Sequence, residues 1–358
     1  MPDHRGTGLQ TPNRFESTTP GNEAEPREAW EEEEPSPSTR FLADASVSII
    51  TRNNSPDVGF TAGINPYRGC EHGCAYCYAR PTHEYLGYSA GLDFETKILV
   101  KHRAPELLAA ALSSPKWVPE PIGMSGVTDC YQPVEGRLKL TRGCLEVLAR
   151  FLNPVFIITK NQLVARDADL LSQLAKHQAV SVCVSVTTLD PELRSALEPR
   201  TSPPAGRLAA IRALSQAGIP VGVFVAPVIP GLNDHEIPRI LEAAAAAGAG
   251  FASYTLLRLP LAVEPIFLEW LERIQPLRKE RIIAGIREVR EGELHDPRFG
   301  SRMRGSGPAA ERIRQLFSIS RRRHGLASGP PELSVSSFRV PDEYRQAKRN
   351  SGGQLDLF

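Results

Sequence analysis

The chain has 358 residues, enough for one large α/β domain or two smaller ones. Its six cysteines are too few for a disulfide-stapled secreted fold, and its net charge of +1 neither requires nor forbids a nucleic-acid partner. Because the sequence has neither a signal-peptide-like start nor an apolar run of transmembrane length, we expect a cytoplasmic protein that does not enter a membrane.

Residues 1–45 are rich in Pro, Ser, Thr and Glu, as in the stretch NEAEPREAWEEEEPSPS. Such a segment offers too little apolar surface to offset the entropy lost when it orders. We therefore expect a disordered acidic tail, followed by one folded unit over residues 46–325.

Short apolar, β-branched runs alternate with amphipathic helical patterns along this unit. The expected strands are 59–65, 122–128, 155–159, 180–187, 220–228 and 251–257. The expected helices lie in LTRGCLEVLARFL, DADLLSQLAKHQ, AGRLAAIRALSQAG and HEIPRILEAAAAAG, and the last two end in the C-cap residues Gly218 and Gly248. The alternation predicts an α/β fold, a partial (β/α)6 TIM-like barrel with a C-terminal helical extension. Functional residues should lie where its strands end.

The stretch NPYRGCEHGCAYCYAR, residues 65–80, places Cys70, Cys74 and Cys77 directly after the first expected strand. Gly69 and Gly73 permit a tight turn, so that the three thiolates can converge. Three thiolates on a four-iron cluster leave one iron without a protein ligand, where chemistry can occur. The spacing therefore favours an iron–sulfur cluster.

Two alternatives stay open for the cysteines. A structural zinc site usually has four ligands in two separated pairs, and no second pair is evident, although His72 can supply a nitrogen. A redox disulfide between Cys74 and Cys77 leaves Cys70 unexplained and lacks a thioredoxin-like context.

The CxxxCxxC spacing, with Tyr76 before the third cysteine, resembles the radical S-adenosylmethionine (SAM) superfamily. Together with SGVTDCYQPVE, ITKN and PVIPGLND, it resembles the spore photoproduct lyase-related, DNA repair photolyase-like group over roughly residues 59–317. The resemblance implies a [4Fe–4S] cluster held by Cys70, Cys74 and Cys77, and SAM as the source of a 5′-deoxyadenosyl radical that abstracts hydrogen from the substrate. It also implies a reductant such as flavodoxin or ferredoxin.

The resemblance further implies roles for residues that bind SAM. The Tyr76 backbone is expected to meet the adenine, and Thr128 and Asp129 occupy the place of the segment that binds the methionyl ammonium. The carboxylate and ribose are expected to contact Lys160, Ser185 and Arg200. Structural alternatives are a loop turn or cap for Thr128 and Asp129, a solvent-facing Lys160, a buried, hydrogen-bonded Ser185, and an Arg200–Glu198 ion pair.

One position departs from the family pattern. Spore photoproduct lyases carry a hydrogen-donating cysteine about three residues before the matching Asp, where this sequence has Gly126. Cys130 is a candidate for a relocated catalytic donor, with an inert buried thiol as the alternative, and Cys144 and Cys183 look structural. We therefore do not expect reversal of the spore photoproduct by the same route.

The last segments bear on substrate and partners. Several basic clusters and the loop HDPRFGSRMRGSG, with His295, Asp296 and Arg298, are candidates for nucleic-acid contact. Residues 326–358 read as a flexible tail that ends in QLDLF, and this peptide resembles those that bind the bacterial sliding clamp. The residues expected to dock are Gln354, Leu355, Leu357 and Phe358.

The leading hypothesis is a radical SAM enzyme that acts on DNA or another nucleic acid, in repair. One alternative is a non-catalytic adaptor, stabilised by zinc or a cluster and recruited to the sliding clamp. Another keeps the radical chemistry and moves it to RNA or a peptide.

Overall fold

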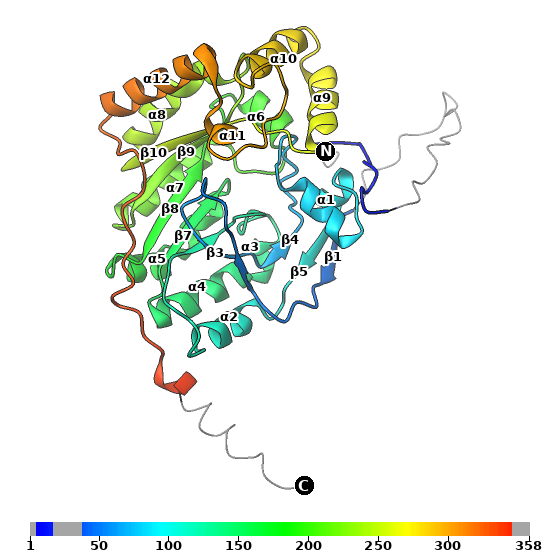
Figure 1. Ribbon diagram of the computed structural model, residues 1–358. Coiled ribbons are helices and arrows are strands. Elements are labelled where there is room, and N and C mark those ends of the chain that lie inside the picture. Colours follow the sequence, from blue (N-terminus) through cyan, green and yellow to red (C-terminus); the bar gives the residue numbers. More distant parts are fainter. Residues whose placement is uncertain (1–4, 17–37, 346–358) are drawn as a thin grey trace.

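The computed structural model describes residues 5–16 and 38–345, and its centre is a sheet in which six strands run parallel in chain order (Figure 1). These strands are β3 (Ala62–Ile64), β6 (Ile122–Met124), β7 (Val155–Thr159), β8 (Val180–Ser185), β9 (Val221–Val228) and β10 (Phe251–Leu256). A short strand, β2 (Ile50–Arg52), pairs antiparallel with β3 at one edge, and β10 forms the other edge. All six predicted strands are confirmed, and so is the partial (β/α)6 barrel.

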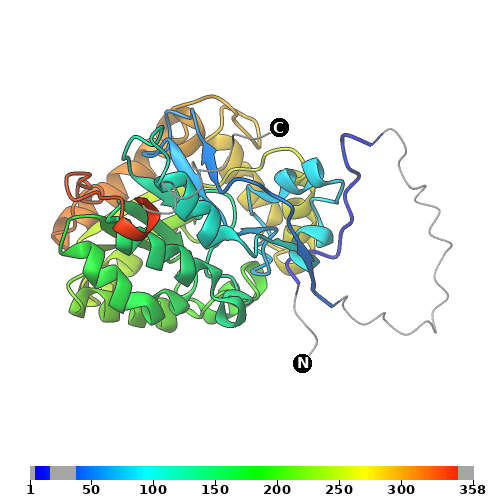
Figure 2. The same ribbon diagram turned by 90° about the horizontal axis from the view of Figure 1, so that it is seen from below.

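Helices cover the outer face of the sheet (Figures 1 and 2). The helices of the described chain are α1 (Leu92–Thr96), α2 (Ala104–Leu112), α3 (Glu135–Leu138), α4 (Leu140–Phe151), α5 (Ala168–Ala175), α6 (Pro191–Leu197), α7 (Pro204–Gln216), α8 (Ile237–Ala246), α9 (Val263–Ile274), α10 (Lys279–Glu288), α11 (Ser301–Arg304) and α12 (Gly307–Arg323), with 3-10 turns η1 (Arg80–Leu86), η2 (Gln162–Asp167) and η3 (Asp234–Glu236). Of these, α1 lies instead beside the strand Lys97–Val100, outside this sheet. Gly218 and Gly248 have φ of 73° and 97°, as expected of residues that end helices. None of the described helices is long and apolar enough to cross a membrane.

The strands form where the sequence is apolar at every position. All six residues of β8 are buried, because helices cover one face and the barrel interior the other. β6 is shorter than the predicted strand since Ser125 adopts a φ of 80°, which turns the chain out of the sheet. This turn sends Thr128 and Asp129 into a loop at the carboxyl end of the sheet.

A second, three-stranded sheet was not predicted. It consists of β1 (Arg40–Ala43), β5 (Lys97–Val100) and β4 (Tyr67–Arg68), in which β1 pairs parallel and β4 antiparallel with β5. Since β4 directly precedes the cysteine stretch, this sheet fixes where that stretch begins. It also orders residues 40–43, which the composition assigned to a disordered tail.

The prediction of disorder over residues 1–45 is wrong for residues 5–16 as well. Gly6 donates its backbone N–H to Glu95 Oε2 over 3.0 Å, and the carbonyl of Leu9 accepts from Leu92 N–H over 2.9 Å. Thr7 is buried. These partners lie more than 80 residues away, so the local composition does not reveal them.

The prediction of a flexible tail after residue 325 is wrong for residues 326–345. Ala327 extends the edge of the sheet, since its N–H donates to Gly250 O over 2.9 Å and its carbonyl accepts from Ala252 N–H over 3.0 Å. The Tyr344 ring then packs on Phe151 with centroids 5.1 Å apart. The peptide QLDLF lies outside the described residues.

Candidate active site at the barrel mouth

The cysteine stretch follows the first barrel strand, β3, and the short strand β4, and it ends where η1 begins. Cys70, Cys74 and Cys77 are free thiols in the described structure, and Gly69 and Gly73 turn the chain between them with φ of 79° and 64°. A Cβ on Gly73 would lie 2.5 Å from Glu95 Oε2, so only glycine fits there.

A buried ion pair fixes this stretch from behind. Arg80 is fully buried against Glu95, and its Nε and Nη2 donate to the carbonyl of Cys74 over 3.1 and 3.0 Å. The N–H of Ala75 donates to Leu197 O over 3.1 Å. The backbone around the second cysteine is therefore held before any cofactor binds.

The donor set fits an iron–sulfur cluster. Burial raises the pKa of Cys70, Cys74 and Cys77, so these thiols need a bound cation to ionise. Within residues 5–16 and 38–345, no three His, Cys, Asp or Glu side chains are placed to hold one metal ion. Cysteines that bind separate irons of a cluster need not meet at one point, whereas zinc requires four ligands around a single centre.

Tyr76 anchors the stretch from the opposite side. Its hydroxyl donates to Glu198, which also accepts from Thr187 Oγ1 over 2.6 Å and pairs with the buried Arg207. Burial opposes ionisation of Glu198, but the charges of Arg207 and Lys160 and the two hydroxyl donors outweigh it and lower its pKa to about 2. The network connects the cysteine stretch to the loop after β8 and to α7.

Arg200 does not pair with Glu198, contrary to the structural alternative. It pairs with Glu71 over 3.1 Å, and its N–H donates to His72 O over 3.3 Å. Arg200 thus braces the stretch between the first two cysteines, and its contact with the SAM carboxylate stays a prediction.

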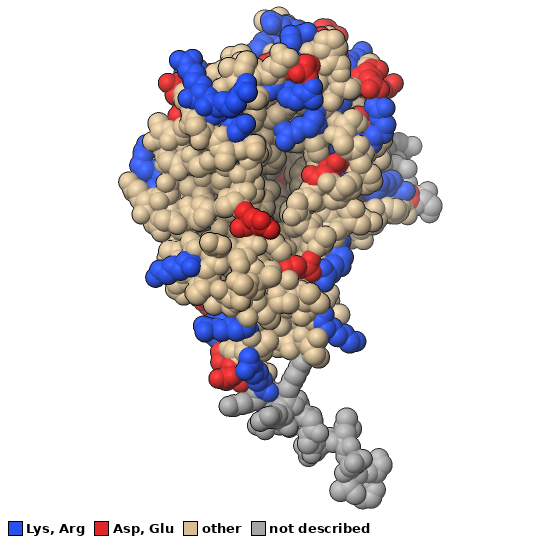
Figure 3. Space-filling model, turned by 60° about the vertical axis from the view of Figure 1, so that its left-hand side comes forward, with Lys and Arg blue, Asp and Glu red and all other residues tan. Residues whose placement is uncertain are grey.

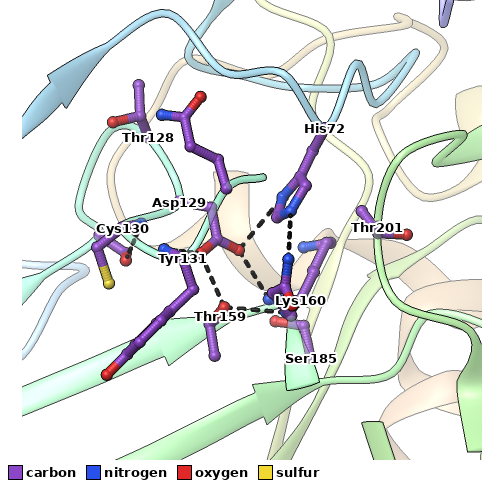
Figure 4. A network of polar contacts seen from close by, with 12 residues as sticks. His72, Thr128, Asp129, Cys130, Tyr131, Thr159, Lys160, Ser185 and Thr201 are labelled. Carbon is purple, nitrogen blue, oxygen red and sulfur yellow. Dashed lines mark hydrogen bonds and ion pairs between the residues drawn. The ribbon is translucent and has the colours of Figure 1, made fainter. Parts of the chain in front are cut away.

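Asp129 forms the centre of a polar network (Figure 4). Its Oδ1 accepts from Thr159 Oγ1 over 2.7 Å and from Tyr131 N–H over 2.9 Å, and its Oδ2 accepts from Lys160 N–H over 2.7 Å. His72 Nδ1 lies 3.4 Å from Oδ2. Protein groups thus surround a carboxylate that was predicted to bind the methionyl ammonium, and they join β7 to the cysteine stretch.

Thr128 serves the same loop. Its hydroxyl donates to Tyr67 O over 2.9 Å, so it bonds the loop after β6 to β4. This matches the structural alternative of a loop turn, and the SAM-binding role of Thr128 stays a prediction.

Lys160 and Ser185 lie together beside this network, at the ends of β7 and β8 (Figure 4). The Lys160 ammonium lies 5.8 Å from the centroid of the Tyr76 ring, and no ion-pair partner for it occurs in the described part of the chain. Ser185 Oγ is buried and lacks a hydrogen-bond partner among those residues. Both groups are available to a ligand, as the predicted SAM contacts require.

Asp129→Asn is expected to lower the free energy of unfolding by about 1–3 kcal/mol, because an amide NH2 would face backbone or hydroxyl donors in place of an acceptor. Asp169→Asn is the matched control, since the Asp169 carboxylate is exposed and, within the described part of the chain, forms an ion pair with Arg142 alone. A surface pair contributes about 1 kcal/mol or less. Urea unfolding of both variants measures the difference. Equal midpoints would contradict the role given to Asp129.

Cys130 does not join these residues. It is 1% exposed within the main hydrophobic core, and its sulfur points away from the Asp129 carboxylate (Figure 4). The structure thus matches the inert thiol, and no described contact supports the predicted role of hydrogen donor. Cys144 and Cys183 are buried as expected.

Two residues at the mouth were not singled out from the sequence. Tyr78, next to Cys77, is 49% exposed, and its hydroxyl donates to Gly126 O over 2.9 Å. The Arg258 guanidinium, from the loop after β10, lies 5.6 Å from the centroid of the Tyr78 ring. Only the fold brings these residues together, although the position of Tyr78 directly after the third cysteine of the stretch is visible in the sequence.

Comparisons with known proteins agree with this geometry. Residues 64–244 match the family model described as the radical SAM superfamily. An uncharacterized protein of Mycobacterium tuberculosis is 36% identical over 286 residues, which are 79% of this chain and 81% of the relative. An uncharacterized protein of Methanocaldococcus jannaschii is 32% identical over 173 residues, 48% of this chain and 62% of that one.

Among solved structures, spore photoproduct lyase complexed with dinucleoside spore photoproduct superimposes with a TM-score of 0.55. The match covers 80% of this chain and 81% of that chain, at 15% identity. This similarity shows a shared fold.

Proposed function

The chain belongs to the radical SAM superfamily. We propose that its substrate is a nucleic acid from which it abstracts hydrogen, in a repair-like reaction. It is a radical SAM enzyme whose cofactors are a [4Fe–4S] cluster and SAM. The observation that carries the choice of substrate is the set of exposed aromatic rings with arginines stacked on them beside the cysteine stretch.

The chain's own residues prepare the barrel mouth for these cofactors. Cys70, Cys74 and Cys77 would hold the cluster, which with SAM supplies a 5′-deoxyadenosyl radical when reduced. The Lys160 ammonium, which faces the Tyr76 ring, would bind the SAM carboxylate, and the buried Ser185 hydroxyl would gain a partner in the ribose. The Arg80–Glu95 and Arg207–Glu198 pairs keep the stretch in place.

Aromatic rings with arginines above them support the nucleic-acid substrate. Arg302 lies 4.3 Å from the centroid of Phe299, which is 59% exposed, and Arg258 covers Tyr78. Figure 3 shows a hollow in one face of the molecule, with Lys and Arg side chains gathered above it and Asp and Glu side chains beside and below it. Stacking rings and cations are the two features by which proteins bind single-stranded or flipped-out nucleotides.

The reaction is expected to differ from spore photoproduct reversal. This chain has Gly126 at the position where spore photoproduct lyases carry the hydrogen-donating cysteine. The nearby Cys130 lies in the hydrophobic core. The substrate radical must therefore be quenched by another group or leave the site by another route.

Formation of 5′-deoxyadenosine tests the proposal. The full chain, reconstituted anaerobically, is incubated with SAM and dithionite, alone or with damaged DNA, undamaged DNA, RNA or a peptide. Nucleic acid is expected to stimulate 5′-deoxyadenosine formation, and a deuterated nucleic acid to transfer deuterium to it. Stimulation by peptide alone would reject nucleic acid as the substrate, and a colourless protein with stoichiometric zinc would support the adaptor.

We further propose two protein partners, a reductant and the sliding clamp; the peptide expected to bind the clamp lies outside the described residues. Reduced flavodoxin or ferredoxin would supply the electron in the cytoplasm, and the sliding clamp would bind QLDLF. Deleting residues 355–358 is expected to abolish clamp binding in a pull-down with purified clamp while leaving 5′-deoxyadenosine formation intact. Unchanged binding after the deletion rejects recruitment through this peptide.

A further inference from the structure

Arg258 is a guanidinium without a carboxylate partner at the mouth of the barrel. Among the described residues its Nε, which is shielded from solvent, has no hydrogen-bond partner, and its Nη1 has one such partner, the sulfur of Met303, over 3.8 Å. No Asp or Glu of the described chain lies within ion-pair distance of it. A partly buried charge with so few contacts loses hydration without compensation.

Two further groups share this environment. Arg290 is 2% exposed and donates to the carbonyls of Leu257 and Ser301, over 2.6 and 3.2 Å, but its Nε has no partner. His295 Nδ1 is also buried without a partner. Hydrogen bonds connect the three groups: Arg290 donates to the residue before Arg258 and to Ser301, and Ser301 Oγ donates to Asp296, the residue after His295. Burial and the charges of Arg258 and Arg290 accordingly lower the pKa of His295.

The nearby carboxylates are engaged elsewhere. Asp57 pairs with Arg302 and accepts from Gly300 N–H over 2.7 Å. Asp296 accepts from Arg298 Nε over 2.9 Å and from Ser301 Oγ over 2.6 Å. The cluster of Arg258, Arg290 and His295 therefore has a surplus of positive charge and unused hydrogen-bonding nitrogens.

We propose that Arg258 and His295, with Arg290 behind them, bind one phosphodiester group of the substrate beside the third cluster cysteine. This inference rests on the proposed nucleic-acid function and adds a subsite to it. Two oxygens of a phosphate can accept hydrogen bonds from the guanidinium group, and its negative charge would balance the excess positive charge of these side chains. The half-exposed Tyr78 ring, which Arg258 already covers, would stack on the base of the adjoining nucleotide.

Binding of a fluorescein-labelled single-stranded DNA oligonucleotide, followed by anisotropy at several KCl concentrations, tests the subsite. The reconstituted full chain is compared with Arg258→Gln and Arg258→Lys. Arg312→Gln is the matched control, because it removes the same charge from a residue on α12 that is paired with Glu288. SAM affinity and melting temperature are measured for each variant.

Arg258→Gln is expected to weaken oligonucleotide binding by about tenfold or more. It should also flatten the slope of log affinity against log salt by about 0.7, the value for one lost phosphate contact on a single strand. Arg258→Lys should keep the slope and lose affinity, and Arg312→Gln should match the unmodified protein.

Three results would overturn the inference. If Arg258→Gln binds the oligonucleotide like Arg312→Gln, the subsite is wrong while nucleic-acid binding stands. If Arg258→Gln loses affinity for SAM and keeps its affinity for the oligonucleotide, then Arg258, Arg290 and His295 belong to the cofactor site. If the unmodified holoenzyme binds no oligonucleotide, the proposed function fails and the subsite fails with it.

Discussion

Alanine at any one of Cys70, Cys74 or Cys77 is expected to remove the cluster and reduce 5′-deoxyadenosine formation to background. Burial raises the pKa of all three thiols, so each thiolate depends on iron for its charge, and the iron cluster in turn has only three protein ligands. With one ligand gone, two thiolates cannot retain a four-iron cluster that already has an open corner.

Iron and sulfide per chain, visible absorbance and 5′-deoxyadenosine are measured for each variant after anaerobic reconstitution. Cys144→Ala is the matched control, because Cys144 is a buried free thiol like Cys70 and Cys74 but lies in α4, within the apolar core. It should lose a little stability and keep its iron. Full iron content and turnover in any of the three loop variants would contradict the assignment.

Glu198→Gln is expected to lower the free energy of unfolding by about 3–5 kcal/mol, because it leaves the Arg207 guanidinium buried without its counter-charge. Arg207 is 1% exposed and Glu198 is fully buried, so water cannot replace the lost partner. The variant also weakens the acceptor of the Tyr76 hydroxyl, and we expect slower cluster incorporation.

Denaturant unfolding of Glu198→Gln, with Glu269→Gln as control, measures this effect. Glu269 pairs with Arg273 one turn along α9; the two side chains are 29% and 46% exposed. A pair that is open to solvent contributes about 1 kcal/mol or less. Replacing Glu198 and Arg207 together with apolar residues of similar size should recover much of the loss, since no charge then remains buried. A loss as small as that of Glu269→Gln would contradict the network.

The same pair predicts a dependence on pH. The pKa of Glu198 is lowered from 4.5 to about 2, so its contribution to stability is complete above pH 4.5 and declines as the pH falls toward 2. The stability difference between the unmodified protein and Glu198→Gln should shrink over that range. Glu198→Gln should accordingly lose less stability on acidification.

The barrel strands and the position of the cysteine stretch after the first of them were predictable because their signals are local. The run 180–187 is apolar and β-branched, and β8 occupies Val180–Ser185 within it. The three cysteines and their glycines lie within nine residues, so one turn of chain carries the whole pattern. The radical SAM assignment follows from this short stretch and is confirmed by the family match over residues 64–244.

The partners of the charged side chains were not predictable. An ion pair between Arg200 and Glu198, two residues apart, was the structural alternative to a contact with SAM, but Glu198 pairs with Arg207 and Arg200 with Glu71. Asp129 is bonded to Lys160 and lies beside His72, both more than 30 residues distant. Sequence spacing carries no information on contacts of this range, because they depend on how the β6 and β7 loops meet after the barrel has formed.

Strand order, the thiol triad and the class of chemistry can thus be read along the chain, because hydrophobic periodicity and ligand spacing act over a few residues. Three other features depend on folding: the packing of residues 5–16 and 326–345, the enclosure of Asp129 and the unpaired Arg258 beside Tyr78. Each requires backbone or side-chain groups from distant segments to meet, and the free energy of those contacts exists only once the sheet has assembled.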